Sequence, residues 1–185
     1  RLEYSEFSFE APAGAGWEMQ RSADGAMFRK ELGSPQHTLV ALVTRSTGFD
    51  PAAVGYAAYA TDPKVFAEYV HAAGEHAARE VADPPRFRTL SEEVVPDTRF
   101  GYCARTYQKS EDRGAPGSSV PLIMENWGYT CLMPAVANII VQIGFSERAP
   151  PGEADPSVAQ MREAFFQPFR FTNAPPAGTP PVPQA

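Results

Sequence analysis

The sequence contains few of the residues that are typical of nucleic-acid binding, metal binding or a membrane span. Its 185 residues include three His, two Cys and only three Lys, and the formal net charge is −6. Since neutralising phosphates requires clustered Lys and Arg, the scattered cations argue against a nucleic-acid partner. The longest apolar run, around residues 135–145, is interrupted by Asn138 and Gln142 and is too short to cross a bilayer.

Sequence motifs of known catalytic chemistry are also missing. There is no hydrolase nucleophile elbow, no phosphate-binding P-loop and no dinucleotide-binding glycine fingerprint. The one cluster that suggests metal or acid–base chemistry is His71, Glu75 and His76, in a helical segment. His71 and Glu75 share a helix face, but His76 lies about 140° from His71 around the axis, so the two imidazoles do not easily meet one ion. We expect a solvated helix face with neither metal nor cofactor, and an enzyme that uses these three residues is the alternative.

The two cysteines carry more information. Cys103 and Cys131 each lie in a segment with strand character, and a turn-rich loop at residues 111–119 separates the segments. If the segments pair antiparallel about position 117, the two Cα atoms lie about 4.5–5.5 Å apart, which a disulfide can span. The same register aligns Arg105 with Tyr129, Tyr107 with Trp127, and Lys109 with Glu125. This pattern predicts a Cys103–Cys131 disulfide and therefore an oxidising compartment, periplasmic or extracellular.

Alternating and helical patterns in the rest of the chain predict an α+β fold. Expected strands occupy residues 4–10, 17–21, 26–32, 37–45, 87–95, 99–109, 120–133 and 135–147. The strand at 37–45 is apolar on both faces, so we expect it at the centre of a sheet covered on two sides. It opens with His37, which has no recognisable partner in the sequence. Asp62-Pro63 and Asp155-Pro156 predict the starts of two amphipathic helices, the first over residues 63–79.

These elements predict one domain followed by a tail. Residues 1–172 are expected to form a single α+β domain, in which an antiparallel sheet of about six to eight strands has two main helices packed on it. Residues 51–59 are expected to form a short helix or an ordered loop. Residues 173–185 carry five prolines among small residues, which predicts a flexible tail. The chain begins at Arg1 rather than Met, as expected of a mature form after signal removal or of a trimmed chain.

Segments at the two ends of the domain carry a family resemblance. In residues 4–13 an alternating apolar strand runs through a proline towards a strand led by Trp17. Residues 137–148 lead through a Pro-rich loop into a helix and then into Phe166-Gln167-Pro168-Phe169-Arg170-Phe171. As a pattern of elements, most of residues 4–171 resembles the PsbP/Mog1-like fold of the photosystem II extrinsic subunit P, which includes small bacterial periplasmic lipoproteins. The resemblance implies a non-catalytic accessory protein that docks on a larger extracytoplasmic assembly.

One group of aromatic residues is a candidate surface for a protein partner. Arg105, Tyr107, Trp127 and Tyr129 share one face of the predicted strand pair. Trp, Tyr and Arg dominate the hot spots of protein interfaces, so an exposed group of this kind would suit docking. The alternative is that these side chains pack in the core.

The leading functional expectation is a non-catalytic extracytoplasmic accessory protein with a protein partner in the cell envelope. Association with the membrane would then be peripheral, through that partner or through a lipid anchor. The first alternative is a small-ligand carrier with a cavity between the helix at 63–79 and the sheet, lined by Tyr59, Phe66 and Tyr69. The second alternative is the enzyme that uses His71, Glu75 or His76.

Overall fold

The computed structural model describes residues 1–47, 50, 54–80, 86–133 and 138–172, with the side chains of all of these except residues 77–80. In this part the chain forms ten strands and three helices. They are, in chain order, β1 (Leu2–Glu3), β2 (Phe7–Phe9), β3 (Glu18–Arg21), β4 (Gly25–Glu31), β5 (Thr38–Thr47), α2 (Tyr56–Thr61), α3 (Pro63–Glu80), β6 (Phe87–Asp97), β7 (Cys103–Asp112), β8 (Leu122–Leu132), β9 (Ile139–Ala149), α4 (Val158–Phe166) and β10 (Arg170–Phe171). The predicted tail at 173–185 and residues 51–53 of the predicted helix or loop lie outside the described residues.

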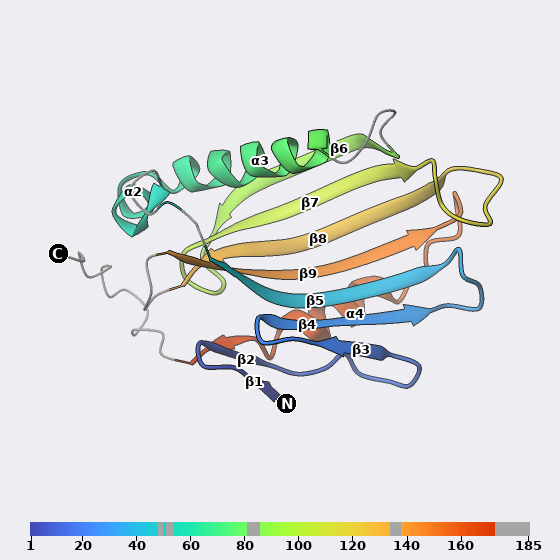
Figure 1. Ribbon diagram of the computed structural model, residues 1–185, viewed down its shortest axis with the longest axis horizontal. Coiled ribbons are helices and arrows are strands. Elements are labelled where there is room, and N and C mark those ends of the chain that lie inside the picture. Colours follow the sequence, from blue (N-terminus) through green and yellow to red (C-terminus); the bar gives the residue numbers. More distant parts are fainter. Residues whose placement is uncertain (48–49, 51–53, 81–85, 134–137, 173–185) are drawn as a thin grey trace.

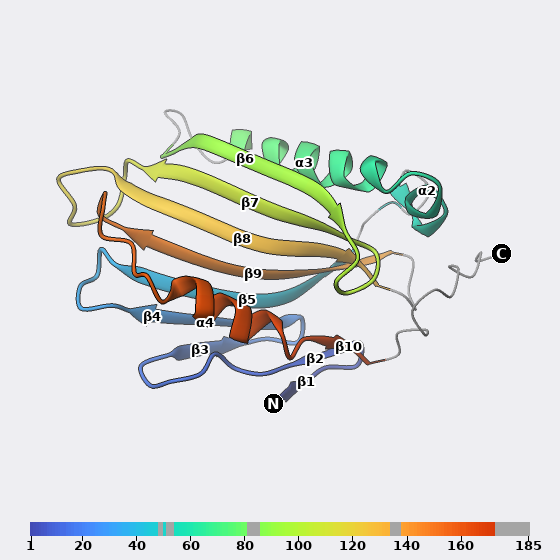
Figure 2. The ribbon, with the colours of Figure 1, turned by 180° about the vertical axis from the view of Figure 1, so that it is seen from behind.

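A seven-stranded antiparallel sheet forms the centre of the molecule, in the order β3-β4-β5-β9-β8-β7-β6. A second sheet of three short strands has the order β1-β2-β10. Helix α3 lies along β6 and β7 on one face of the large sheet (Figure 1). Helix α4 crosses the opposite face, near the small sheet (Figure 2). The predicted α+β class, with an antiparallel sheet and two main helices, is confirmed, and the helices cover different parts of opposite faces.

Most of the apolar burial lies on the α4 face. Aromatic rings from the large sheet, from the small sheet and from α4 meet there, and Phe9, Phe28 and Phe145 all contact Phe165 with ring centroids 6.2 to 6.4 Å apart. All four side chains are at most 2% exposed. Buried aromatic side chains contribute large areas removed from water, and their edge-to-face contacts add about 0.5–1.5 kcal/mol per pair. This cluster therefore fixes α4 and the small sheet against the large one.

A smaller core lies between α3 and the sheet. Phe66 and Ala67 of α3 pack with Ala104 of β7 and Leu132 of β8, and all four are buried. Of the apolar stripe predicted within residues 63–79, Phe66 is buried and Tyr69 and Val70 are half-buried, whereas Ala73 is exposed and the side chain of Ala77 lies outside the described residues. None of the described helices is long and apolar enough to cross a membrane.

The two predicted helix starts differ in outcome. Helix α3 begins at Pro63 directly after Asp62, whose carboxylate accepts a hydrogen bond from the Lys64 amide at 3.0 Å. Helix α4 begins at Val158, because Asp155 instead accepts hydrogen bonds from the amide and hydroxyl of Ser157, both at 2.7 Å, and forms a turn before the helix.

The disulfide between Cys103 and Cys131 is confirmed, and so is the register that predicted it. Strands β7 and β8 pair antiparallel with Cys103 opposite Cys131. The other three predicted pairs, Arg105 with Tyr129, Tyr107 with Trp127 and Lys109 with Glu125, are also directly opposed. Both cysteines are fully buried, at the end of the strand pair nearest to α2. A buried disulfide at this position is consistent with an oxidising compartment.

The other end of the same strand pair is held by a buried ion cluster. Asp112 is 0% exposed and accepts hydrogen bonds from Arg86 at 2.6 and 2.7 Å, from Arg148 at 3.3 Å and from the Gly114 amide at 3.1 Å. Burial alone would raise the pKa of the Asp112 carboxyl, but these hydrogen bonds and the two guanidinium charges hold its pKa below the usual value. Strand β7 thus begins at a disulfide and ends at a buried carboxylate.

We predict that removing the disulfide with the double substitution Cys103→Ala, Cys131→Ala lowers the free energy of unfolding by about 3–4 kcal/mol. The loop that the bond closes spans a sequence separation of 28, and the unfolded chain gains its freedom when the bond is lost. Urea unfolding of the wild type and the variant measures the difference. Mass spectrometry of non-reduced peptides that found two free thiols would contradict the bond itself.

We predict that Asp112→Asn lowers the free energy of unfolding by about 3 kcal/mol at neutral pH, because it leaves two guanidinium groups without their charged partner. This loss lies at the lower end of the range for breaking a buried ion pair, because the Arg86 side chain is 39% exposed. A carboxyl with a depressed pKa stabilises the fold above its unfolded pKa, and the contribution is lost as the pH falls through the folded pKa. The deficit of the variant should therefore shrink towards acid pH in parallel urea titrations. Glu93→Gln, in an exposed pair with Arg105, is the control and should change stability by less than about 1 kcal/mol.

Candidate functional site

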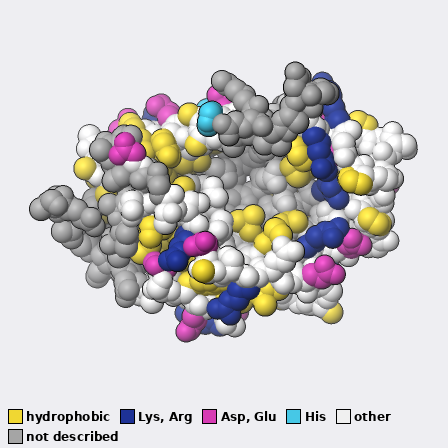
Figure 3. All heavy atoms as spheres, in the orientation of Figure 1, with side chains coloured by type: hydrophobic (Ala, Val, Ile, Leu, Met, Phe, Trp, Pro, Cys, Tyr) yellow, Lys and Arg dark blue, Asp and Glu magenta, His cyan; other side chains and the backbone are white. Residues whose placement is uncertain are grey.

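An open groove lies on the α3 face of the large sheet, between α3 and β5. A hollow of about 220 Å³ over β5, β9, β8 and β7 adjoins a second hollow of about 360 Å³ against α3. Thr106, Asn126, Thr130 and Gln142 line both, so the two are continuous. Figure 3 shows this face of the molecule and its hollowed centre. We refer to the two hollows together as the groove.

The centre of the groove floor lacks side chains. Gly128 of β8 lies directly opposite Gly144 of β9, and this pair lies between Thr106 on β7 and Leu42 on β5. Because directly opposed residues project from the same face of a sheet, these four positions form one row across the strands. Two glycines at the middle of the row leave a trench there.

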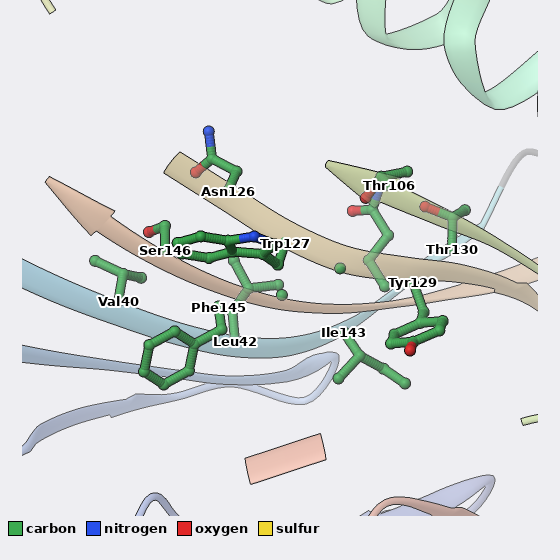
Figure 4. Close-up of a pocket in the computed structure, with 13 residues that line it drawn as sticks. Val40, Leu42, Thr106, Asn126, Trp127, Tyr129, Thr130, Ile143, Phe145 and Ser146 are labelled. Atoms are coloured by element: carbon green, nitrogen blue, oxygen red, sulfur yellow. The ribbon is translucent and has the colours of Figure 1, made fainter. Parts of the chain in front are cut away.

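The rows on either side of the trench carry neutral polar side chains. Asn126 and Ser146 are directly opposed on one side, and Thr130 and Gln142 are directly opposed on the other. Asn126, Thr106 and Thr130 project towards the α3 side in Figure 4, whereas Phe145, Ile143 and Tyr129 project to the opposite face. The trench therefore has amide and hydroxyl groups along both walls.

These polar groups have no partners among the described residues. The side chains of six floor residues make no hydrogen bond to any other described residue: Thr106, Gln108, Asn126, Thr130, Gln142 and Ser146. Elsewhere in the described structure, by contrast, several polar side chains are tied into pairs, such as Tyr107 with Glu125 at 2.6 Å. Neutral donors and acceptors that converge on a hollow are available to a bound molecule.

Apolar side chains close the two ends of the groove. Val40 and Leu42 of β5 are half-buried at one end. Tyr69, Val70 and Ala73 of α3 form the other. The prediction that the strand at 37–45 is covered on both sides is therefore wrong for one face, because α3 covers only the β6–β7 side of the sheet and leaves Val40 and Leu42 partly open.

The two glycines of the floor differ in what they permit. A Cβ atom at Gly128 would lie 2.6 Å from the backbone oxygen of Ile143, so the close approach of the strands requires glycine there. A Cβ atom at Gly144 would lie 3.4 Å from Cγ of Leu42, which is an ordinary contact. Gly144 therefore leaves space that a larger residue could occupy, and glycine inside a strand is otherwise unfavourable.

The candidate docking surface is divided between core and solvent. Tyr129 is buried against Phe100 and Phe166, with ring centroids 5.0 and 5.4 Å apart. Trp127 is half-buried, and the guanidinium of Arg162 lies 4.6 Å from the centre of its ring.

The two remaining members of that surface are more open and already have partners. The Arg105 side chain is 43% exposed and lies 3.3 Å from the Glu93 carboxylate. Tyr107 donates a hydrogen bond to Glu125, and this bond raises the pKa of the phenol. These side chains lie on the α4 face of the sheet, opposite the groove.

The three residues predicted to line a pocket lie in two different environments. Tyr59 and Phe66 are buried and pack on each other, with ring centroids 5.9 Å apart. The Tyr59 hydroxyl donates to the backbone oxygens of Cys103 at 3.0 Å and Asp97 at 3.2 Å, and burial raises its pKa. Both side chains fill the space under α3, whereas Tyr69 lines the groove beside it.

The ionisable candidates on α3 do not form a metal site. Nδ1 of His71 lies 3.3 Å from the Glu92 carboxylate, and the His71 side chain is 47% exposed. Glu75 and His76 are exposed as well. No group of His, Cys, Asp or Glu side chains suited to a metal ion occurs in the described part of the chain.

His37 does have a partner that the sequence did not reveal. Its Nε2 lies 2.7 Å from the buried carboxylate of Glu147, which also accepts the Asp155 amide at 2.7 Å. The sequence showed no recognisable partner because the two residues are far apart in the chain, and only the pairing of β5 with β9 brings position 37 close to position 147. This contact ties the start of β5 to the loop before α4.

Sequence reasoning missed the groove because it depends on three strand pairings at once. The available signal was a second hairpin: pairing residues 120–133 with 135–147 about position 136 places Gly128 opposite Gly144. The run of small and neutral residues at alternate positions of both strands would then have predicted an uncovered, uncharged face.

We predict that Gly128→Ala and Gly144→Ala differ in stability although they are neighbours. The first forces the Ile143 backbone to move and should lower the free energy of unfolding by about 1–3 kcal/mol. The second should change it by less than about 1 kcal/mol, because its methyl group meets only the Leu42 side chain at an ordinary distance. Urea unfolding of both variants tests this, and equal losses would contradict the difference in strand spacing.

Comparison with known proteins gives no family assignment. No family model matches the chain, and no curated protein matches it. The candidate site therefore rests on its geometry: an open, neutral, glycine-floored groove bordered by α3 and β5.

Proposed function

We propose that this protein is a non-catalytic extracytoplasmic accessory protein, and that it docks a partner protein in the groove. The observation that carries the proposal is Gly144, which leaves the floor open at a position where a side chain fits. The neutral side chains around it, without partners in the described structure, support a binding role over a purely structural one. Glycine within a strand often occurs where a ligand or another backbone approaches closely.

The location of the protein is part of the same proposal. The Cys103–Cys131 bond supports an oxidising environment, and we propose the periplasm or the cell exterior. The order of strands and helices supports a PsbP/Mog1-like fold, with an antiparallel sheet between helices on opposite faces. On this proposal the protein belongs with small envelope lipoproteins, and it meets the membrane through its partner or through a lipid anchor.

A small-ligand carrier is the second candidate. The hollow against α3, at about 360 Å³, falls within the range of small-molecule sites. Tyr69 and Val70 supply an apolar wall, and Thr106 and Gln142 supply polar groups, a mixture typical of such sites. The groove is open rather than enclosed, which favours docking (Figure 3).

We predict that Gly144→Val abolishes docking without unfolding the protein. The valine side chain would project into the trench, so a partner that occupies it should be lost from co-purification out of cross-linked envelope fractions. Thermal unfolding should stay close to that of the wild type, since valine suits a strand.

One control variant and a second measurement identify the surface and the kind of ligand involved. Tyr107→Ala, on the α4 face, should leave co-purification unchanged if the groove is the docking site. The opposite result, with loss in Tyr107→Ala and retention in Gly144→Val, would assign docking to the surface of Arg105, Tyr107, Trp127 and Tyr129. A small molecule that native mass spectrometry finds on the wild type but not on Gly144→Val would establish the carrier.

A further inference from the structure

The direction of the trench limits the shape of what it can hold. Its floor row, Thr106–Gly128–Gly144–Leu42, runs across the strands, and Val94 of β6, which lies opposite Thr106 and lines the hollow against α3, extends the row on that side. Neighbouring strands lie about 4.8 Å apart, so the row from β6 to β5 measures about 19 Å. A chain in extended conformation rises about 3.3 Å per residue and covers that length with about six residues.

The walls match the hydrogen-bonding pattern of a polypeptide backbone. An extended chain presents N–H and C=O groups to both of its sides, and each needs a partner when it leaves water. Asn126 on one wall and Gln142 on the other each carry a donor and an acceptor on one amide. The hydroxyls of Ser146 and Thr130, directly opposite these amides, can also donate or accept.

Charge complementarity favours an uncharged occupant. Among the described residues, no Lys, Arg, Asp or Glu lines the hollow over β5, β9, β8 and β7. In the part of the chain that the structure describes, the charged side chains of the neighbouring row lie towards its two ends, Glu92 beside α3 and Arg29 on β4, and both are engaged. Glu92 lies 3.3 Å from His71, and Arg29 lies 2.7 Å from Glu31. A charged group at the centre would lose its hydration without gaining an ionic partner.

The apolar ends and the glycine floor determine the spacing and the apolar character of the side chains that a bound chain would place in the groove. In an extended chain, alternate side chains point the same way, so about three of six would face the floor. One at the middle fits the space over Gly144, and the outer two reach the apolar ends at Leu42 and Tyr69.

We infer that the groove binds an extended, uncharged polypeptide segment of about six residues, which lies across the strands with apolar side chains at alternate positions. This inference rests on the proposed docking function and names the part of the partner that the site recognises. The bound backbone runs nearly perpendicular to the strands, so it is held by side-chain amides and hydroxyls and not by a shared ladder of backbone hydrogen bonds.

A random hexapeptide library displayed on phage tests the inference with the intact protein as bait. Selection on the wild type should enrich uncharged hexapeptides with apolar residues at alternate positions. A synthetic, terminally blocked copy of the most enriched peptide should bind about five- to tenfold more weakly to Asn126→Ala, since one hydrogen-bonding amide is lost. Gly144→Val should remove its binding altogether. Gln160→Ala is the matched control, because Gln160 is an exposed amide on α4, and it should bind the peptide as the wild type does.

Each other outcome overturns the inference in a distinguishable way. Enrichment of charged peptides, or binding that Gly144→Val leaves intact, would show that any peptide site lies elsewhere. If no peptide is enriched but a partner still depends on Gly144 in co-purification, docking stands and a peptide segment is excluded. An oligosaccharide array probed with the wild type and with Gly144→Val would then show whether a glycan on the partner is recognised. No enrichment and no Gly144-dependent partner would remove the inference and the proposed function together.

Discussion

The aromatic cluster on the α4 face of the large sheet determines much of the rest of this structure. Phe9, Phe28, Phe145 and Phe165 meet on the α4 face of the large sheet, and each is almost completely removed from water. At about 25 cal/mol per Å² of apolar surface, such a cluster supplies much of the free energy that holds strands β4, β5 and β9 in place. Because this face provides the stability, the other face of the same strands does not have to be covered. Helix α3 packs mainly over β6 and β7, and the groove lies on the neighbouring strands that it leaves open.

The strand pair at the groove floor is held at both of its ends. Strand β7 starts at the Cys103–Cys131 disulfide and ends at Asp112, whose carboxylate binds Arg86 and also Arg148 of the next-but-one strand. Between these two points lie the polar side chains that line the trench. A site whose backbone is fixed beforehand loses little conformational entropy when it binds, which favours affinity. The disulfide and the buried ion cluster therefore also fix the backbone of the groove floor between them, in addition to stabilising the fold.

Whether a feature could be predicted from the sequence depends on how far apart in the chain its contacting residues lie. The register of β7 and β8 was predictable because four pairs, among them Cys103 with Cys131, agree on one alignment about a single loop. The contact between His37 and Glu147 was not predictable, because it joins residues that are 110 positions apart in the chain. Tyr59 and Phe66 show the same limit: their apolar character predicted a place between helix and sheet, but only packing decides whether such rings line a cavity or fill it. Gly128 and Gly144 form a floor only because they lie directly opposite each other in β8 and β9.

The edge of the sheet explains why the groove, and not an open strand, is the better binding site. Strand β6 is 11 residues long and forms an edge of the large sheet, where exposed backbone groups can pair with another chain. Its pairing with β7 is interrupted by a register shift between Thr89 and Ser91, and ion pairs such as Arg88 with Glu111 and Arg105 with Glu93 flank it. Irregular pairing and charged side chains are features by which proteins prevent edge-to-edge association. The groove has the opposite character, with regular pairing and neutral side chains. The charged surface near β6 thus discourages unspecific contact, while the neutral floor remains open to a partner that can meet its hydrogen-bonding groups.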